Sequence, residues 1–193
     1  HVQADMVMYP DGESPMYMQA WPDSRRSVTG FYLADAIRLK GGKRIDLNAR
    51  WDVAATRLYS GIGYDQLLVF YPDLTSGNTT STGAVNAEFS FPTGSKVRTQ
   101  FHVGYGERLP TTSELFGFYL FNRQDGHDYL GNPYLSTERS YATDITTSYF
   151  GKSVELKGHV FYQYCPDYII AFLDPLIAPM TPGAYGTKVY TNI

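Results

Sequence analysis

The sequence lacks most features on which soluble disulfide-rich, zinc-binding and nucleic-acid-binding proteins rely. Its 193 residues include a single cysteine, Cys165, which excludes an internal disulfide framework and a zinc cluster built from two cysteine pairs. No run of about eighteen apolar residues occurs, so a transmembrane helix is excluded. The net charge is -3 and the bases form no stripe that could neutralise phosphates, so we expect no nucleic-acid partner.

The motifs of common catalytic sites are also missing. The chain has no Gly-x-Ser-x-Gly, no His-Glu-x-x-His and no glycine-rich loop followed by Lys-Ser or Lys-Thr. Gly61-Ile62-Gly63 lacks the third glycine of a dinucleotide fingerprint. We therefore expect neither an enzymatic activity nor a cofactor, and we assign no metal site.

Aromatic residues, in contrast, are abundant. There are 17 tyrosines, 11 phenylalanines and 2 tryptophans, together 16% of the chain, whereas charged residues make up only 18%. This composition suits the interfacial belts of a membrane barrel better than the aliphatic core of a soluble domain. The mean hydropathy of -0.29 does not oppose a barrel, because barrel strands are only half apolar.

Strict alternation of apolar and polar residues predicts β-strands. It is clearest over 44–53 and returns over 96–105 and 153–164. Weaker copies bring the expected number of strands to about seven; they cover 28–39, 82–91, 139–150 and 188–193. We expect one face to carry Ile45, Leu47, Trp51, Val97, Phe101, Val103, Val154, Leu156 and Val160. The opposite face should carry Arg50, Arg98, Gln100, His102, Lys157 and His159.

The connections between these strands alternate in length. Tight turns are expected at 40–43, 92–95 and 151–152, and long segments at about 54–81, 106–138 and 165–186. A meander with short turns at one end and long loops at the other is typical of outer-membrane barrels. The alternative is a small closed barrel or a soluble β-sandwich that acts as a binding or structural module.

Two motifs resemble those of TonB-dependent outer-membrane receptors of Gram-negative bacteria. The segment 104–115 is similar to the pattern that ends one strand of that family, and 131–140 is similar to the pattern that opens the next strand. The matching positions are Gly104, Arg108, Pro110, Glu114, Leu115, Gly131, Asn132, Pro133, Leu135, Glu138 and Ser140. Asp167-Tyr168-Ile169 also matches the Asp-x-Ile that usually follows the second of the next two strands.

The resemblance implies an all-β fold, an antiparallel up-and-down meander that forms a sector of a barrel of about 22 strands. Short turns would face the periplasm and long loops the cell exterior. Residues 1–193 would be a fragment of one β-barrel domain, without the plug domain and the closing strand. The implied function is active uptake of a scarce nutrient (siderophore, haem, metal or glycan), and the partners would be the outer-membrane bilayer, the TonB complex through a missing N-terminal part, and the cargo.

Two segments are candidates for ligand contacts. Met6, Met8, Met16 and Met18 surround a loop-like Pro-Asp-Gly segment and could offer thioether sulfur to copper(I), although methionine is also a flexible filler of irregular surfaces. His127 and Asp128, in the sequence Asp-Gly-His-Asp, could bind an ion, but such a sequence more often forms a solvated turn. We expect Glu138 and Arg139 to pair with neighbouring strands rather than with a ligand.

Overall fold

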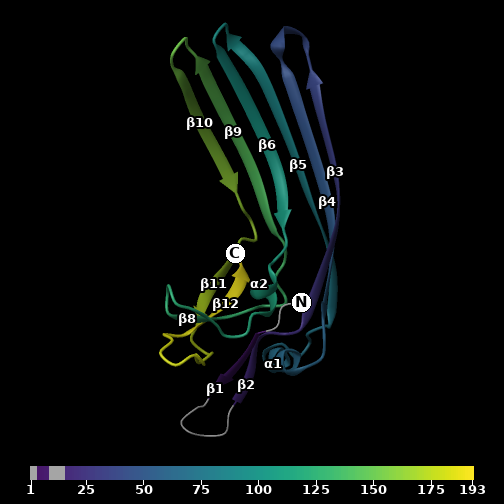
Figure 1. Ribbon diagram of the computed structural model, residues 1–193, viewed down its shortest axis with the longest axis vertical. Helices are drawn as coiled ribbons and strands as arrows, with labels where there is room; N and C mark the ends of the chain where they lie inside the picture. The colour runs from purple at the N-terminus through teal and green to yellow at the C-terminus, as the bar shows by residue number, and fades with distance from the viewer. Residues whose placement is uncertain (1–3, 9–15) are drawn as a thin grey trace.

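Six long strands form one open antiparallel sheet, here called the wall. The computed structural model describes residues 4–8 and 16–193. The wall consists of β3 (Ser24–Arg38), β4 (Arg44–Leu58), β5 (Gly77–Gly94), β6 (Val97–Arg108), β9 (Glu138–Phe150) and β10 (Glu155–Tyr164). Their order in the sheet is β10-β9-β6-β5-β4-β3, so the long strands neighbour one another in chain order (Figure 1). The predicted all-β antiparallel meander is confirmed, and the sheet is not closed into a barrel.

Tight turns join the wall strands in pairs at one end. Residues Lys40–Gly42 form a 3-10 turn in which Gly41 and Gly42 have φ angles of 74° and 71°, in the left-handed region that favours glycine. β5 runs to Gly94 with a bulge after Pro92, so the second turn lies at 95–96 rather than at 92–95. The third turn spans 151–154, where Gly151 N–H donates to the carbonyl of Val154.

The long connections contain more regular structure than the sequence predicted. They hold two helices, α1 (Ile62–Phe70) and α2 (Thr112–Phe116), and three short strands, β7 (Leu120–Asn122), β8 (His127–Leu130) and β11 (Ile169–Asp174). Wall strands also run further than expected: β4 continues to Leu58 and β6 to Arg108, because Gly104 and Gly106 remain paired with β5 and β9. The ladder ends just before Pro110, which cannot donate.

The last predicted strand does not belong to the wall. β12 (Thr187–Asn192) pairs with β11 and, in parallel, with β8, which gives a small sheet of order β11-β12-β8-β7. An additional hairpin, β1 (Ala4–Met8) and β2 (Met16–Trp21), precedes the wall. In Figure 1 these elements gather at the end of the wall opposite to the tight turns. None of the helices in the described ranges is long and apolar enough to cross a membrane.

The two faces of the wall differ in polarity, as the alternation predicted. Residues that pair directly lie on the same face, and rows such as Ile45, Phe89, Phe101 and Ile145 therefore continue across the strands. The apolar face exposes large side chains: Phe31, Leu33, Leu47, Trp51, Val85, Phe101, Val103, Ile145, Leu156 and Val160. The predicted faces are confirmed, except that Val154 lies in the turn before β10 rather than in the strand.

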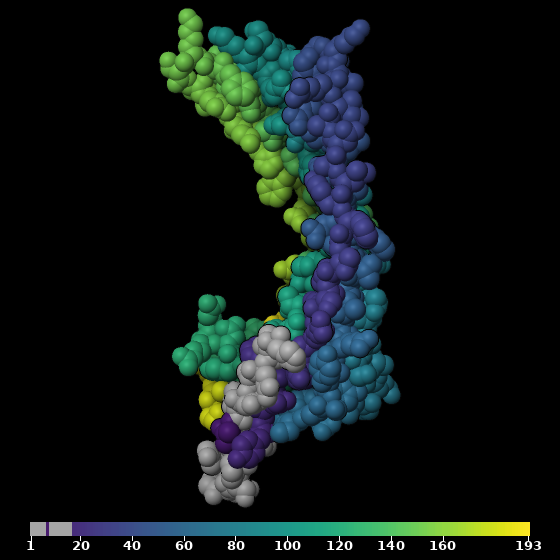
Figure 2. All heavy atoms as spheres, turned by 45° about the vertical axis from the view of Figure 1, so that its right-hand side comes forward, coloured from purple at the N-terminus to yellow at the C-terminus, as the bar shows by residue number. Residues whose placement is uncertain are grey.

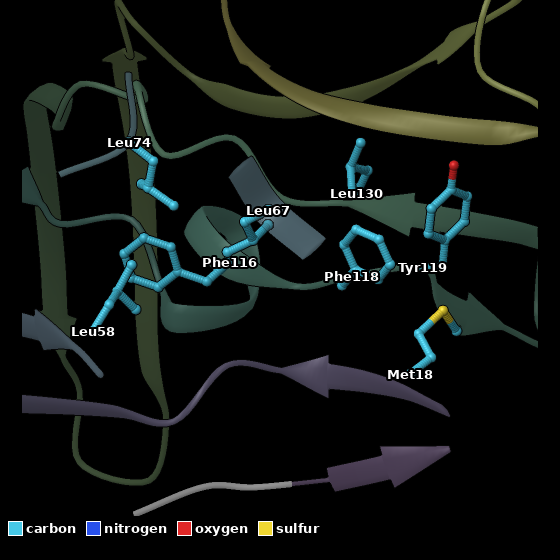
Figure 3. Close-up of a cluster of buried hydrophobic side chains, with 8 residues drawn as sticks. All are labelled: Met18, Leu58, Leu67, Leu74, Phe116, Phe118, Tyr119 and Leu130. Atoms are coloured by element: carbon cyan, nitrogen blue, oxygen red, sulfur yellow. The ribbon is translucent and has the colours of Figure 1, made fainter. Parts of the chain in front are cut away.

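The buried core lies among the loops rather than inside the wall. It consists of Met18, Leu58, Leu67, Leu74, Phe116, Phe118, Tyr119 and Leu130 (Figure 3). These side chains come from the β1–β2 hairpin, the end of β4, both helices and the segment around β8. The loops are therefore a packed layer of their own, and Figure 2 shows a hollow between this layer and the far end of the wall.

Candidate functional site at the junction of wall and loops

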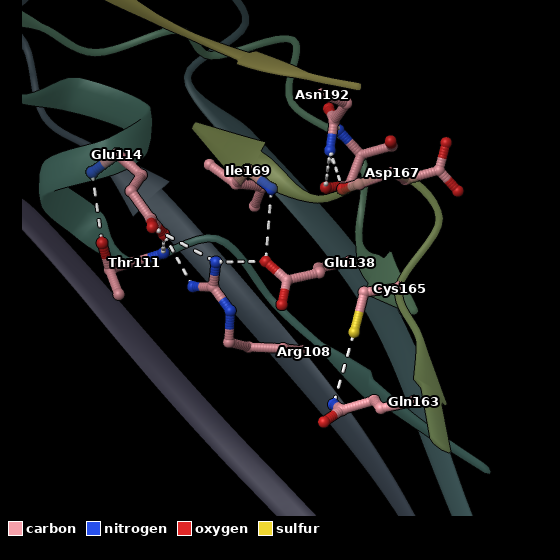
Figure 4. Close-up of polar contacts among 10 residues, drawn as sticks. Arg108, Thr111, Glu114, Glu138, Gln163, Cys165, Asp167, Ile169 and Asn192 are labelled. Carbon is pink, nitrogen blue, oxygen red and sulfur yellow. Dashed lines mark hydrogen bonds and ion pairs between the residues drawn. The ribbon is translucent and has the colours of Figure 1, made fainter. Parts of the chain in front are cut away.

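The family-motif residues meet where β6 and β9 end. The Arg108 guanidinium donates to Glu114 of α2 at 2.9 Å and to Glu138 of β9 at 2.7 Å (Figure 4). The same Glu138 oxygen, Oε2, also accepts a hydrogen bond from the backbone N–H of Ile169 at 3.2 Å. Arg108 thus joins the wall to α2, and Glu138 joins it to β11. Glu138 pairs with the neighbouring strand β6, as expected, whereas Arg139 pairs with Asp167 in the segment before β11.

Glu114 completes a capping box at the start of α2. The Thr111 hydroxyl accepts from the N–H of Glu114, and the Glu114 carboxylate accepts from the N–H of Thr111. Burial alone would raise the pKa of Glu114, but the hydrogen bonds from Arg108 and Thr111 outweigh it and hold this pKa below its usual range. The carboxylate therefore stays ionised at neutral pH.

The second motif, 131–140, packs against α2. A side chain at Gly131 would approach the backbone nitrogens of Phe116 and Gly117 to within 2.6 and 2.7 Å, so only glycine fits there. Asn132 donates its backbone N–H to the Glu114 carbonyl at 2.8 Å and its side-chain amide to the Tyr190 carbonyl at 3.0 Å. These contacts explain why the two motifs occur together. The first motif contains α2, and the second holds α2 in position.

A pocket of about 580 Å³ lies between the polar face of the wall and this motif layer. Its wall side is formed by positions of β3, β4 and β5: Arg26, Ala54, Thr56, Leu58, Asn78 and Thr80. Its loop side includes Leu109, Pro110, Leu115, Phe116, Pro133, Tyr134 and Leu135. Four motif residues, Pro110, Leu115, Pro133 and Leu135, therefore line it.

Among the described residues, Arg26 is the only basic one that lines this pocket. It is half-buried, and its Nε donates to the Thr56 hydroxyl at 3.1 Å. Across residues 4–8 and 16–193, no carboxylate lies within ion-pair distance of its guanidinium. The pocket has both apolar and polar lining, and Arg26 adds a positive charge to it, an arrangement that suits an anionic group on a partly apolar molecule. No pattern in the sequence pointed to Arg26.

The polar face carries hydrogen-bonded pairs further along the wall. Gln100 donates to Glu88 at 2.8 Å, and Asp144 lies 2.9 Å from Nδ1 of His102 and 3.4 Å from Nε2 of His159. The residues in the described ranges form no group of three or more histidine, cysteine or acidic side chains suited to holding a metal ion. These side chains form a hydrogen-bonded polar surface.

The methionine segment is a hairpin of two strands rather than a loop. Residues on both sides of the expected loop form the β1–β2 hairpin, in which Met6 pairs with Met18 and Met8 with Met16, so these positions are strand rather than loop. The Met18 side chain is almost fully buried in the loop core. The Tyr9-Pro10-Asp11-Gly12 part lies outside the described residues, and copper binding stays a prediction.

The segment around His127 is a turn that leads into a strand. Asp125 accepts from Lys188 at 2.7 Å and from Tyr129 at 2.5 Å, and these two hydrogen bonds lower its pKa to about 2. His127 lies against Tyr185, with ring centroids 5.9 Å apart. Asp128, expected in a solvated turn, is instead fully buried and accepts the backbone N–H groups of Met180 and Thr181, both at 2.8 Å.

Comparison with known proteins agrees with this architecture. The family model described as TonB dependent receptor-like, beta-barrel matches residues 3–193. The solved structure of the copper transporter OprC is similar with a TM-score of 0.67 and 14% identity, covering 92% of this chain and 24% of that one. The Serratia marcescens hemophore receptor HasR, solved as a double mutant with its hemophore HasA and heme, has a TM-score of 0.63 and 16% identity, covering 92% and 32%.

Both neighbours are much longer than this chain, which spans about a quarter of one and a third of the other. No curated protein matches at the sequence level. At these identities the structural neighbours establish the fold alone, whereas the family model covers nearly every residue. The chain therefore belongs to the TonB-dependent receptor-like β-barrel family.

Proposed function

We propose that this chain forms part of the wall and loops of an outer-membrane receptor that takes up a scarce nutrient by active transport. The observation that supports this most directly is the opposite polarity of the two wall faces. If the apolar face contacts lipid, Arg50, Arg98 and Lys157 all lie on the other face, out of the hydrocarbon. Placing an arginine or lysine in the hydrocarbon would lower the stability of the barrel by about 2 to 4 kcal/mol at the midplane of the membrane. The polar face then lines the lumen.

The positions of the turns and loops support one orientation of the chain in the membrane. In outer-membrane barrels short turns lie at the periplasmic side and longer loops at the outside. The three tight turns would therefore be periplasmic, and the loop layer with α1, α2 and the small sheet would be extracellular. Energy for uptake would come from the TonB complex, which would act through a part of the receptor outside this chain.

The pocket beside Arg26 is our candidate for cargo contact. It lies at the extracellular end of the lumen face, between the wall and the motif layer, where an incoming molecule would first reach the lumen. Its partly apolar lining and the Arg26 guanidinium would favour an anionic cargo with an apolar body. Siderophores, haem, metal complexes and glycans all remain within the cargo class, and transport rather than catalysis is the activity.

Uptake by the full-length receptor tests this proposal. Cells that carry and lack the receptor gene would be compared for growth and accumulation with ferric siderophores, haem, copper and oligosaccharides, each as sole source. We expect one of these to require the receptor and the TonB complex. Arg26→Gln should weaken binding of that cargo, while the control Arg50→Gln, on the same face but outside the pocket, should not. Accumulation unaffected by loss of the receptor for every cargo would contradict the proposal.

A further inference from the structure

Three side-chain oxygens are buried without a hydrogen-bond partner at one place in the loop layer. They are Oδ1 of Asp128 in β8, Oγ1 of Thr187 in β12 and Oγ1 of Thr181 in the segment before β12. Among the described residues, no group makes a hydrogen bond to any of the three. Buried polar atoms are nearly always paired, so three such atoms together point to a ligand that they share.

The fold places these three side chains side by side. β8 and β12 pair in parallel, and their register sets Thr187 directly opposite Asp128, so both side chains leave the sheet on the same face. Thr181 donates its backbone N–H to Oδ2 of Asp128 at 2.8 Å, so its side chain starts beside the same carboxylate. The Asp128 N–H donates to the Gly186 carbonyl at 3.0 Å, which holds the chain just before Thr187 against β8.

The shared face of these strands is turned toward the apolar core. Asp128 and Thr187 are both 0% exposed. The next residue on this face of β8 is Leu130, which belongs to the buried core of the loop layer (Figure 3), and the next on β12 is Val189, which packs against that core. His127 lies on the other face of β8, because neighbours in a strand alternate, and takes no part in the group.

The charge of Asp128 has no cation beside it. Its Oδ2 accepts two backbone N–H groups, and its Oδ1 accepts none. In the described ranges no basic side chain lies within ion-pair distance of Asp128, and the nearby Lys188 pairs with Asp125 instead. Burial first, and then the charge of Asp128, raise the pKa of the Tyr119 hydroxyl. A fully buried carboxylate is costly without a compensating charge, so a positive ion fits this place best.

The donor set indicates which kind of ion. A carboxylate oxygen and two hydroxyl oxygens are hard ligands, which suit ions such as sodium or calcium rather than copper(I) or zinc. Calcium affinity depends on the number of charged ligands, and this group has one carboxylate. A single negative charge is balanced by a monovalent ion.

We propose that Asp128, Thr181 and Thr187 bind a sodium ion in the loop layer. The ion lies among Oδ1 of Asp128 and the two hydroxyl oxygens, and it joins the β8–β12 pair to the segment before β12. It neutralises the buried carboxylate and so holds this segment against the small sheet. The site belongs to the loop layer alone and depends neither on the cargo nor on the placement of the wall in a membrane.

Hydrogen exchange of the full-length receptor in detergent would test the site. Samples in sodium chloride would be compared with samples in choline chloride at the same concentration, because the choline cation is too large for the group. The N–H groups of Met180 and Thr181 exchange only when they leave the Asp128 carboxylate, so the segment 180–187 reports on it. Exchange there should slow by about tenfold in about 300 mM sodium, as for a dissociation constant of about 30 mM. Helix α1 should exchange equally in both salts.

Thr187→Val distinguishes an ion ligand from a hydroxyl without any partner. If the Thr187 hydroxyl had no partner in the folded protein, a methyl group in its place would leave exchange unchanged or slower, and any sodium effect would persist. As an ion ligand, its loss should remove the slowing by sodium and leave exchange in choline close to that of the wild type. Thr181→Val and Asp128→Asn should also lose the sodium effect. Thr82→Val, at a buried threonine of β5 in the wall, should keep it.

Equal exchange of the wild type in sodium and choline, or a sodium effect that persists in Thr187→Val, would overturn the site. Faster exchange of Thr187→Val in both salts would also overturn it, because the hydroxyl would then bond directly to Asp128. Slowing by calcium chloride but not by sodium would contradict the charge argument. Each of these results could be obtained with a receptor that takes up its cargo, which would leave the transport proposal intact.

Discussion

Arg108 of β6 and Glu138 of β9 face each other at the last rung of their strand pair, and the guanidinium donates to the carboxylate at 2.7 Å. The same guanidinium holds Glu114 of α2. The end of the wall and the first turn of the loop layer are thus fixed by one side chain. The motif residues are widely spaced in the sequence because they belong to β6, α2 and β9, which the fold brings together.

Replacing Arg108 should loosen the loop layer while leaving the wall intact. Arg108→Ala leaves the carboxylates of Glu114 and Glu138, each less than a fifth exposed, without their cation. Because Arg108 itself is partly exposed, we expect a local cost of about 1 kcal/mol. Amide hydrogen exchange should speed up in 111–117 and 168–170 but not in the wall.

The control for this substitution is Arg50→Ala, which removes an arginine from an exposed pair with Asp52 on the same face. It should leave exchange in the loop layer unchanged. If exchange in 111–117 were the same in Arg108→Ala as in wild type, the junction would not depend on this arginine.

The loop layer should also respond to acid through Glu114. The folded state holds the pKa of Glu114 below its ordinary value near 4.5, so the carboxylate contributes stability in full above that value. The contribution should be lost as the pH falls through the lowered pKa of the folded state. Trp21 reports on α2, because its indole N–H donates to the Ser113 hydroxyl at 3.0 Å.

Fluorine NMR of 5-fluorotryptophan in the full-length receptor, with the Trp21 signal assigned through Trp21→Phe, would follow this titration. The Trp21 signal should be constant from neutral pH to about pH 5 and shift below it. Glu114→Gln, which cannot titrate, should remove the pH dependence. A signal that shifted equally in Glu114→Gln would show that another group is responsible.

Gly131 should tolerate no side chain. The Cβ of Gly131→Ala would meet backbone atoms of Leu115, Phe116 and Gly117 at 2.6 to 2.7 Å, so α2 must move. We expect a loss of about 1 to 3 kcal/mol in local stability, measured as faster exchange in α2. Gly158→Ala on β10, where nothing lies within 4 Å, should have no such effect. Equal exchange in the two variants would contradict the tight packing described for Gly131.

Period-two alternation was sufficient to predict the wall, because each wall strand has one apolar and one polar face and pairs with a neighbour in sequence. The loop layer has no such pattern. α2 could have been found from Thr111 and Glu114, whose spacing is that of a capping box. The parallel pairing of β12 with β8 joins segments about sixty residues apart and depends on packing that no local pattern encodes.

Candidate sites were harder to predict than strands. The family motif located the junction, but the pocket beside it depends on Arg26, which lies in β3 far from the motif and has no distinctive neighbours in sequence. Asp128 resembled a solvated turn residue because its neighbours Asp125 and Gly126 are typical of turns. Its burial follows from the 180–181 backbone, which supplies two N–H donors from a distant segment.

The central claim is that the apolar face of the wall contacts lipid and the polar face lines the lumen. Two substitutions on β6 test it directly. Val103 lies on the apolar face near the middle of the strand, and Val103→Arg should destabilise the receptor by about 2 to 4 kcal/mol. Gln100 lies on the polar face beside Glu88, which would accept from an arginine, so Gln100→Arg should cost little.

The measurement is urea unfolding of both full-length variants and the wild type in bilayers. We predict a large loss of unfolding free energy for Val103→Arg and a small change for Gln100→Arg. Equal losses, or a greater loss for Gln100→Arg, would contradict the assignment of the two faces.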